Sequence, residues 1–313
     1  MSGVATVIGA GIIGLTTALR LQDAGLRVVI VSSDDPEATT SVLATAMVGP
    51  TFGLSGPRAA AWEAETVGLL LANGETPGVH LLRGRFIAVP EGFIPPSAQQ
   101  LPGFALCTDA ERPEGFGTAF WLEVPVVDMP LYLRHLAATF ARRGGELRRE
   151  AVATLADVED LAPLVANCSG LGARELVPDD QVEPIRGPKI IVANPGIDTF
   201  CITAPGTETT SYHPLGDVVV LGGSHVPSAD TTPDPDEEAA IVDRCAAIEP
   251  RLRGVEVLEH RVGLRPSRPE VRLERERIGS VTVVHNYGHG GVGVTLSWGC
   301  AKEAAQLLVG RQA

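Results

Sequence analysis

Residues 7–14 read Val-Ile-Gly-Ala-Gly-Ile-Ile-Gly, which places three glycines in the pattern G-x-G-x-x-G. Val4 to Ile8 is a short apolar run that predicts a buried parallel strand. The residues after the third glycine predict a helix that runs to about Ala24, and Gly25 is placed to end it. A glycine-rich turn between a strand and a helix is typical of a dinucleotide-binding fold.

Each glycine has its own physical role in such a turn. Gly9 permits the tight turn, Gly11 leaves room for a pyrophosphate beside the backbone, and Gly14 lets the helix pack closely on the strand. The first helical turn, which contains Ile13, offers free N–H groups and a positive dipole end to a phosphate. The alternative is a glycine-rich turn in some other α/β protein, but it leaves the next strand and its acidic residue unexplained.

The second strand is predicted from Arg27 to Val31, and Ser-Ser-Asp-Asp follows it. An acidic residue near the end of this strand is expected to accept hydrogen bonds from an adenosine ribose. The acid comes one or two residues late in this chain, so Asp34 is the candidate, with Ser33 beside it.

A second glycine-rich segment lies at the other end of the chain. Residues 285–300 read His-Asn-Tyr-Gly-His-Gly-Gly-Val-Gly-Val-Thr-Leu-Ser-Trp-Gly-Cys, which predicts a loop that runs into a long helix. A cofactor that needs both ends of the chain is expected to be long, which favours FAD over a small nucleotide held by one local motif. An NAD-dependent dehydrogenase is disfavoured because the C-terminal segment would then have no role.

The composition is that of an acidic globular protein, with 313 residues, a net charge of −13 and 44% hydrophobic residues. The length is enough for two compact domains. The negative charge argues against nucleic acid or an anionic membrane surface as a partner. No segment predicts a transmembrane helix or a signal peptide, and we expect a cytoplasmic protein.

The five cysteines are scattered, at positions 107, 168, 201, 245 and 300. They show neither C-x-x-C nor a Cys/His spacing suited to a metal. We therefore expect reduced thiols and no metal site.

The pattern of strands and helices predicts an α/β fold. A Rossmann-like FAD-binding domain is expected to carry a second, mostly antiparallel β-sheet substrate domain. Helices are predicted at about 58–71, 129–143, 236–248 and 291–310, and strands at 84–89, 146–149, 164–167, 189–192 and 217–221. The FAD-binding domain is expected to be discontinuous, with residues 1–50, 120–175 and 260–313, and the substrate-binding domain to contain residues 51–119 and 176–259.

The segment from His285 to Ala301 closely resembles the signature of the D-amino acid oxidase family. Further segments similar to this family are Gly-Leu-Arg-Pro-Ser-Arg-Pro at 263–269, Asn-Cys-Ser-Gly at 167–170, Val-Asp-Met-Pro at 127–130 and Leu-Gly-Gly at 221–223. The resemblance covers essentially the whole chain, which looks like a short bacterial member of the family.

The resemblance implies non-covalently bound FAD and oxidative deamination of a D-amino acid, with hydride transfer to the flavin N5. The imino acid product would hydrolyse to a 2-oxo acid and ammonia, and O2 would reoxidise the flavin and yield H2O2. The resemblance leaves a homodimer open. Carried over by position, the further cofactor contacts are Thr40, Ser41, Met47, Gly49, Val152, Ser169, Gly170, Gly290, Gly291, Gly293, Val294 and Thr295.

Two positions match the family's contacts with the substrate. Arg265 matches the arginine that binds the carboxylate, and a planar guanidinium suits a bidentate contact of this kind. The backbone carbonyl of Gly291 matches the acceptor of a hydrogen bond from the amine. No side-chain base is required if the amine binds neutral, because the flavin supplies the chemistry and the protein orients the substrate.

The chain departs from the family where a tyrosine usually covers the substrate. An ungapped comparison places Ser211 at that position, with Tyr212 one residue later, and one residue in a strand turns a side chain to the other face. A local bulge would bring Tyr212 back, so it is the candidate substrate contact, with Ser211 kept open. His213 could serve instead, although an exposed loop is the simpler expectation for this residue.

The residues near the cofactor are also smaller than usual in the family, at 46–50 and at Val292. The segment 203–213 is too short for a long lid. We therefore hypothesise an open pocket that takes a larger or unusual amino acid. Arg58, Arg83 and Arg85 could pair with an acidic substrate, although solvated surface positions are the safer assumption.

Three other functions stay open. A related amine oxidase for a modified or N-substituted amino acid would keep Arg265 and the flavin but reject ordinary D-amino acids. A flavin-binding protein with little turnover is favoured only by the altered segment at Ser211 and Tyr212. The sequence does not show which face of Cα meets the flavin, so an L-amino acid also stays open as the substrate.

Overall fold

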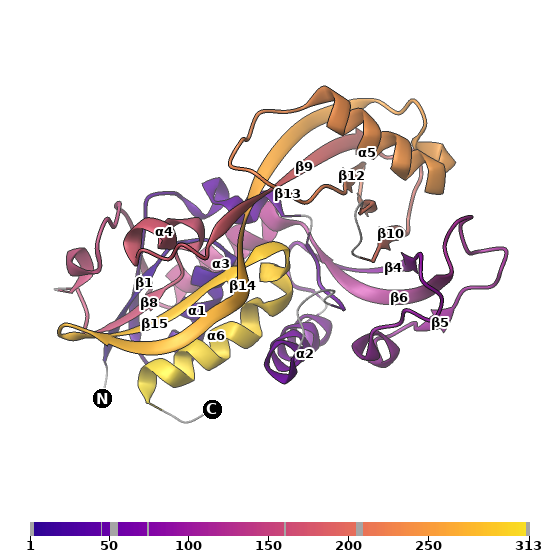
Figure 1. Ribbon diagram of the computed structural model, residues 1–313. Helices are drawn as coiled ribbons and strands as arrows, with labels where there is room; N and C mark the ends of the chain where they lie inside the picture. The colour runs from indigo at the N-terminus through magenta and orange to yellow at the C-terminus, as the bar shows by residue number, and fades with distance from the viewer. Residues whose placement is uncertain are drawn as a thin grey trace.

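The computed structural model describes residues 3–44, 46–50, 56–73, 75–159, 161–204 and 209–310. Within these residues the strands form one continuous sheet, in the order β3-β6-β4-β10-β11-β12-β9-β14-β15-β8-β1-β2-β7, with β5 paired to β6 and β13 to β9. The two ends of the sheet lie on opposite sides of the molecule, with β1, β8 and β15 on the left of Figure 1 and β4 and β6 on the right. No helix in these ranges is long and apolar enough to cross a membrane.

One end of the sheet is parallel. Its strands, in spatial order, are β7 (Glu146–Arg149), β2 (Arg27–Ser32), β1 (Val4–Ile8), β8 (Leu164–Asn167) and β15 (Val281–His289). The helices of this end are α1 (Ile12–Asp23), which packs against α3 (Met129–Arg142) and α6 (Gly293–Val309). Since β1 and β8 are parallel neighbours, their carboxyl ends open at the same edge of the sheet, where such folds bind ligands.

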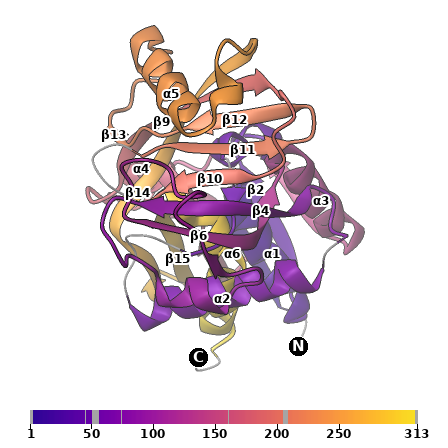
Figure 2. The ribbon, with the colours of Figure 1, turned by 90° about the vertical axis from the view of Figure 1, so that its right-hand side faces the viewer.

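The other end of the sheet is mostly antiparallel. Its main strands are β9 (Glu183–Ala193), β12 (Val218–Gly222), β11 (Ser211–Leu215), β10 (Phe200–Thr203), β4 (Val79–Ala88) and β6 (Thr118–Val127), and only the β10–β4 pair is parallel. Figure 2 shows these strands stacked between α5 (Pro235–Ile248) and α2 (Pro57–Ala72). The short elements are β3 (Ala46–Met47), β5 (Ala105–Leu106), β13 (Val226–Pro227) and α4 (Ala173–Leu176). The predicted fold class is confirmed.

A single long strand connects the two ends. β14 (Val257–Ile278) pairs with β9 through its first part and with β15 through its last part, and its register with β15 shifts between Ser267 and Arg272. This strand was not predicted from the sequence. Its charged residues pair along the strand itself, as Arg272 does with Glu274 at 2.6 Å, so the sequence lacks the alternation of polar and apolar residues that marks a half-buried strand.

A polar network fixes the junction between β14 and β15. Tyr287 donates a hydrogen bond to Asp179 (2.8 Å) and accepts one from Arg272 (2.7 Å), while Arg268 forms an ion pair with Asp179 at 3.1 Å. Burial opposes the charge of Asp179, but the hydrogen bonds from Tyr287 and the Gln181 amide, with Arg268, outweigh it and lower the pKa of the carboxyl. Arg268 and Arg272 thus have structural partners.

The domain boundaries expected from the sequence stay a prediction, and two elements make contacts across them. Most of β6 lies within the segment 120–175, which was predicted to belong to the FAD-binding domain, yet β6 pairs with β4 in the antiparallel end. Conversely, α2 packs against α6 of the parallel end. That contact is close, because a Cβ added at Gly299 would lie 2.2 Å from the Cα of Trp62.

Candidate active site

A cavity of about 1220 Å³ opens between the two ends of the sheet. Its lining reaches from Asp34, after β2, past the turn at Gly9 and the end of β15, to Arg265 and Ser211 in the antiparallel end. It therefore joins the two glycine-rich segments that lie at opposite ends of the sequence.

The turn after β1 is packed so closely that its glycines leave no room for side chains. Gly9 has φ of 101°, and a Cβ there would lie 2.6 Å from the Cys168 carbonyl oxygen; a Cβ at Gly14 would lie 1.9 Å from the Gly9 carbonyl oxygen. Ser41 Oγ accepts a hydrogen bond from the Ile12 amide at 3.0 Å, and α1 has no acidic residue in its first turn. The positive end of α1 therefore faces a cavity that fits an anionic group.

The structure brings nearly all predicted cofactor residues to this cavity. Gly14 does not line it, in keeping with the packing role expected for the third glycine of the motif. The predicted residues that do line it are Gly9, Gly11, Ile13, Ser33, Asp34, Thr40, Ser41, Met47, Gly49, Val152, Ser169, Gly170, Gly290, Gly291, Gly293, Val294 and Thr295.

Hydrogen bonds hold the walls of the cavity together. Ser169 donates its hydroxyl to Asn167 at 2.7 Å, which fixes the turn after β8. Thr295 donates to the Met47 carbonyl at 3.3 Å, which ties the start of α6 to β3.

His289, at the end of β15, is buried and lines the cavity. Burial lowers its pKa to about 3, and its Nε2 has no hydrogen-bond partner among the described residues.

Arg265 lies on β14 with its guanidinium inside the cavity. Nη1 donates to the carbonyl oxygens of Arg186 and Ser224, both at 3.0 Å, and a Cβ at Gly187 would lie 2.3 Å from the guanidinium carbon. Burial lowers the pKa of Arg265, although an arginine remains charged in proteins. Gly291 lies beside it, since a Cβ there would be 3.3 Å from Arg265 Cδ. No carboxylate pairs with Arg265 within the described ranges.

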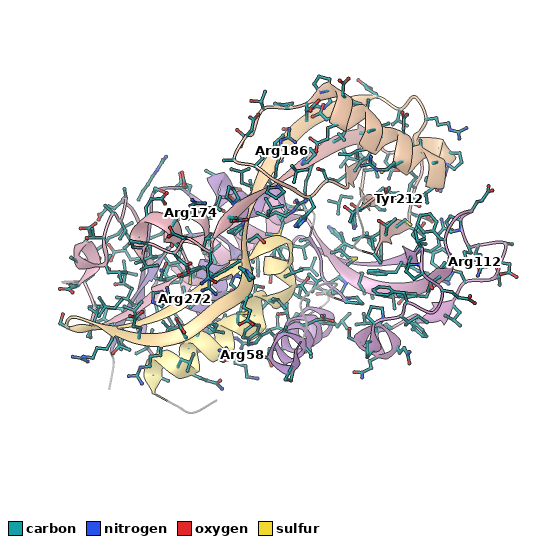
Figure 3. The ribbon with its side chains drawn as sticks, viewed as in Figure 1. Arg58, Arg112, Arg174, Arg186, Tyr212 and Arg272 are labelled. Carbon is teal, nitrogen blue, oxygen red and sulfur yellow. The ribbon has the colours of Figure 1, made fainter. Side chains whose placement is uncertain are left out.

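The structure does not bring Tyr212 to the cavity. β11 pairs with β10 and β12 without a bulge, so Ser211 and His213 face the cavity and Tyr212 faces the opposite side. There Tyr212 is fully buried beneath α5, in a cluster that includes Ile241 and Cys245 (Figure 3). The prediction that Tyr212 faces the cavity is therefore wrong, and Ser211, the alternative, lines the cavity instead. His213 is buried rather than part of an exposed loop.

The charged side chains that line the cavity near Arg265 are not the arginines that were considered from the sequence as partners of an acidic substrate. Arg58 pairs with Glu303, and the guanidinium groups of Arg83 and Arg85 lie over the Trp121 ring; none of the three lines the cavity. Lys189, His225 and Arg244 line the cavity and were not predicted from the sequence as site residues. No group of three or more metal-ligating side chains is found in the part of the chain that the structure describes.

The glycine turn, the cavity and the arginine together fit a flavin-dependent oxidoreductase. A family model described as FAD dependent oxidoreductase matches residues 5–307, and the chain belongs to this family. It is 40% identical to a D-amino-acid oxidase from Rubrobacter xylanophilus (97% of this chain, 95% of the relative) and 42% identical to one from Streptomyces coelicolor (97% and 96%). It shares its fold with glycine oxidase from Geobacillus kaustophilus, with a TM-score of 0.80 at 19% identity, over 100% of this chain and 96% of that one.

Proposed function

We propose that this protein is an FAD-dependent oxidase that converts D-amino acids to 2-oxo acids, ammonia and H2O2. The observation that carries the proposal is the placement of Arg265 beside Gly291 in the same cavity as the glycine turn of β1. The identity of 40–42% to D-amino-acid oxidases over nearly the whole chain supports it.

The cofactor would be held by both ends of the chain. Gly9, Gly11 and the first turn of α1 would bind the pyrophosphate, and Asp34 would accept hydrogen bonds from the ribose. Residues 290–295 would contact the flavin ring. Bound there, the flavin would accept a hydride from the substrate Cα.

Arg265 would bind the substrate carboxylate. Two backbone carbonyls already hold its Nη1, so the guanidinium is oriented before the substrate arrives, and Nη2 and Nε are left for a bidentate contact. The Gly291 carbonyl would accept a hydrogen bond from the amine. With two substituents of Cα fixed in this way, the hydrogen of only one enantiomer points toward the flavin, which gives stereospecificity by orientation.

We also propose the working context of the reaction. The FAD-binding part would contain the parallel end of the sheet and the substrate-binding part its antiparallel end, with β14 shared between them. O2 would be the oxidant, the protein would act in the cytoplasm, and a homodimer is the oligomeric state to test.

Anaerobic titration of the purified protein tests the function directly. The visible flavin band is recorded, and D- and L-amino acids are then added without oxygen. Bleaching by D-amino acids alone is the expected result. Bleaching by L-amino acids, or by N-substituted amino acids only, would replace the proposal with one of the alternative oxidases. A flavin that no amino acid bleaches would indicate a binding protein with little turnover.

A further inference from the structure

We propose that a second carboxylate-binding site lies beside Arg265, formed by Lys189, Ser211 and His213, and that the preferred substrates are D-amino acids with an acidic side chain. This inference rests on the proposed function and names the substrate class of the same site.

The geometry of three neighbouring strands creates the space for a second carboxylate. Ser211 pairs with Gly222, and Gly222 pairs with Lys189, so the three residues form one row across β11, β12 and β9. Residues paired in this way share a face of the sheet. The central residue has no side chain, and a Cβ added there would meet only Ser211 Oγ, at 3.3 Å, and the Pro188 carbonyl oxygen, at 3.9 Å. A gap about two strand spacings wide, or about 10 Å, therefore separates the backbones of Ser211 and Lys189.

The gap adjoins the carboxylate-binding arginine. The Arg265 guanidinium covers Gly187, which lies two residues before Lys189 on β9 and therefore on the same face. All of these residues line the cavity. A substrate whose α-carboxylate contacts Arg265 can thus direct its side chain toward Lys189 and Ser211.

His213 supplies a buried polar group that a ligand would satisfy. It lies two residues after Ser211 on the same face of β11 and is 2% exposed, and its ring stacks on Phe200. Neither ring nitrogen has a hydrogen-bond partner among the described residues. A buried donor without a partner is costly, whereas an acceptor such as a carboxylate would remove that cost.

The charge of this end of the cavity also favours an anion. In the described lining the carboxylates are Asp34 and Glu150, next to the β2 end, and Glu237, which is paired with Arg186. An amino acid with a neutral side chain brings one carboxylate, which Arg265 would bind. An acidic side chain brings a second carboxylate, which would favour the protonated form of Lys189 beside it.

The pKa values of Lys189 and His213 are consistent with a carboxylate bound between them. Burial, with Arg265 and Arg261 nearby, holds the pKa of Lys189 well below its usual value, and a bound carboxylate would raise it again. Burial and the nearby Lys189 lower the pKa of His213 to about 3, so its ring is neutral and still donates one N–H.

Matched pairs of substrates test the proposal on the flavin-loaded enzyme. The values of kcat/KM are measured for D-glutamate against D-glutamine and for D-aspartate against D-asparagine, which differ in side-chain charge but hardly in shape. We expect at least one acid to exceed its amide by about 10- to 100-fold, the factor that a hydrogen bond between charged groups provides. If both amides equal or exceed their acids and still reduce the flavin, this inference is overturned while the proposed oxidase function stands. If no D-amino acid reduces the flavin, both fail.

Variants then assign the effect to residues. Lys189→Met should reduce the acid-to-amide ratio by about tenfold or more, and Lys189→Arg should retain part of it. Arg253→Met is the matched control, because Arg253 is exposed and lies outside the cavity, and it should leave the ratio unchanged. An acid preference that survives Lys189→Met would show that the second carboxylate binds elsewhere and would refute the assignment.

Discussion

Replacing Gly187 with alanine should weaken substrate binding because the new methyl group displaces the Arg265 guanidinium, the side chain nearest to it. The new Cβ would lie 2.3 Å from the guanidinium carbon, so the guanidinium must move by about 1.2 Å to reach van der Waals distance. Its two hydrogen bonds at 3.0 Å, to Arg186 and Ser224, cannot both survive that shift. A misplacement of about 1 Å costs on the order of 100-fold in rate, so kcat/KM should fall by about that factor.

The assay separates misplacement of Arg265 from general damage. Steady-state kinetics with a D-amino acid should show the larger change in KM, because the carboxylate contact is made in the ground state as well as the transition state. The free energy of unfolding should fall by about 1.5–3 kcal/mol, the value of one hydrogen bond from a charged group, because at least one of the two must be lost. Gly68→Ala in α2 is the control, since no atom would lie within 4 Å of its Cβ. An unchanged KM in Gly187→Ala would refute the role given to Arg265.

Three further substitutions test other parts of the structure. Gly9→Ala would place a Cβ 2.6 Å from the Cys168 carbonyl oxygen at a residue with φ of 101°. The dissociation constant of FAD, measured by flavin fluorescence, should rise by tenfold or more, or about 1.4 kcal/mol, and an unchanged affinity would contradict the pyrophosphate site. Gly299→Ala, with a Cβ 2.2 Å from Trp62 Cα, should lower the free energy of unfolding in urea by about 1–3 kcal/mol or more, and a neutral effect would mean that α2 and α6 separate easily. The folded protein lowers the pKa of Asp179, so its carboxylate stabilises the fold above about pH 3.9, and this contribution is lost as the pH falls below that value. In Asp179→Asn the free energy of unfolding should therefore fall less steeply as the pH is lowered through this range. If it falls as steeply as in the unmodified protein, Asp179 does not contribute to the pH dependence.

The parallel end of the fold could be predicted because its signals are local. The strand Val4–Ile8, the glycines after it and the strand Leu164–Asn167 were each expected at the positions where the structure has them. In these segments a short run of residues sets both the backbone conformation and the buried face. The C-terminal helix was expected from Gly291, whereas a 3-10 turn at Gly290–Val292 precedes a helix that begins at Gly293.

The antiparallel end was less predictable because its strands depend on their partners. β14 has charged pairs two residues apart, such as Glu259 with Arg261, which give no apolar alternation. The side of the sheet to which Tyr212 points depends on whether β11 contains a bulge. Only the register of β11 with β10 and β12 shows that it has none.

The sequence by itself determined that this chain carries a glycine-rich turn after its first strand, a C-terminal glycine loop and a segment around Arg265 that resembles the family's, because each of these signals is carried by contiguous residues. Only the tertiary structure decided that Lys189, Ser211 and His213 share one face beside Arg265. Their proximity comes from hydrogen bonding between strands that are distant in sequence, and no local pattern encodes which strands become neighbours.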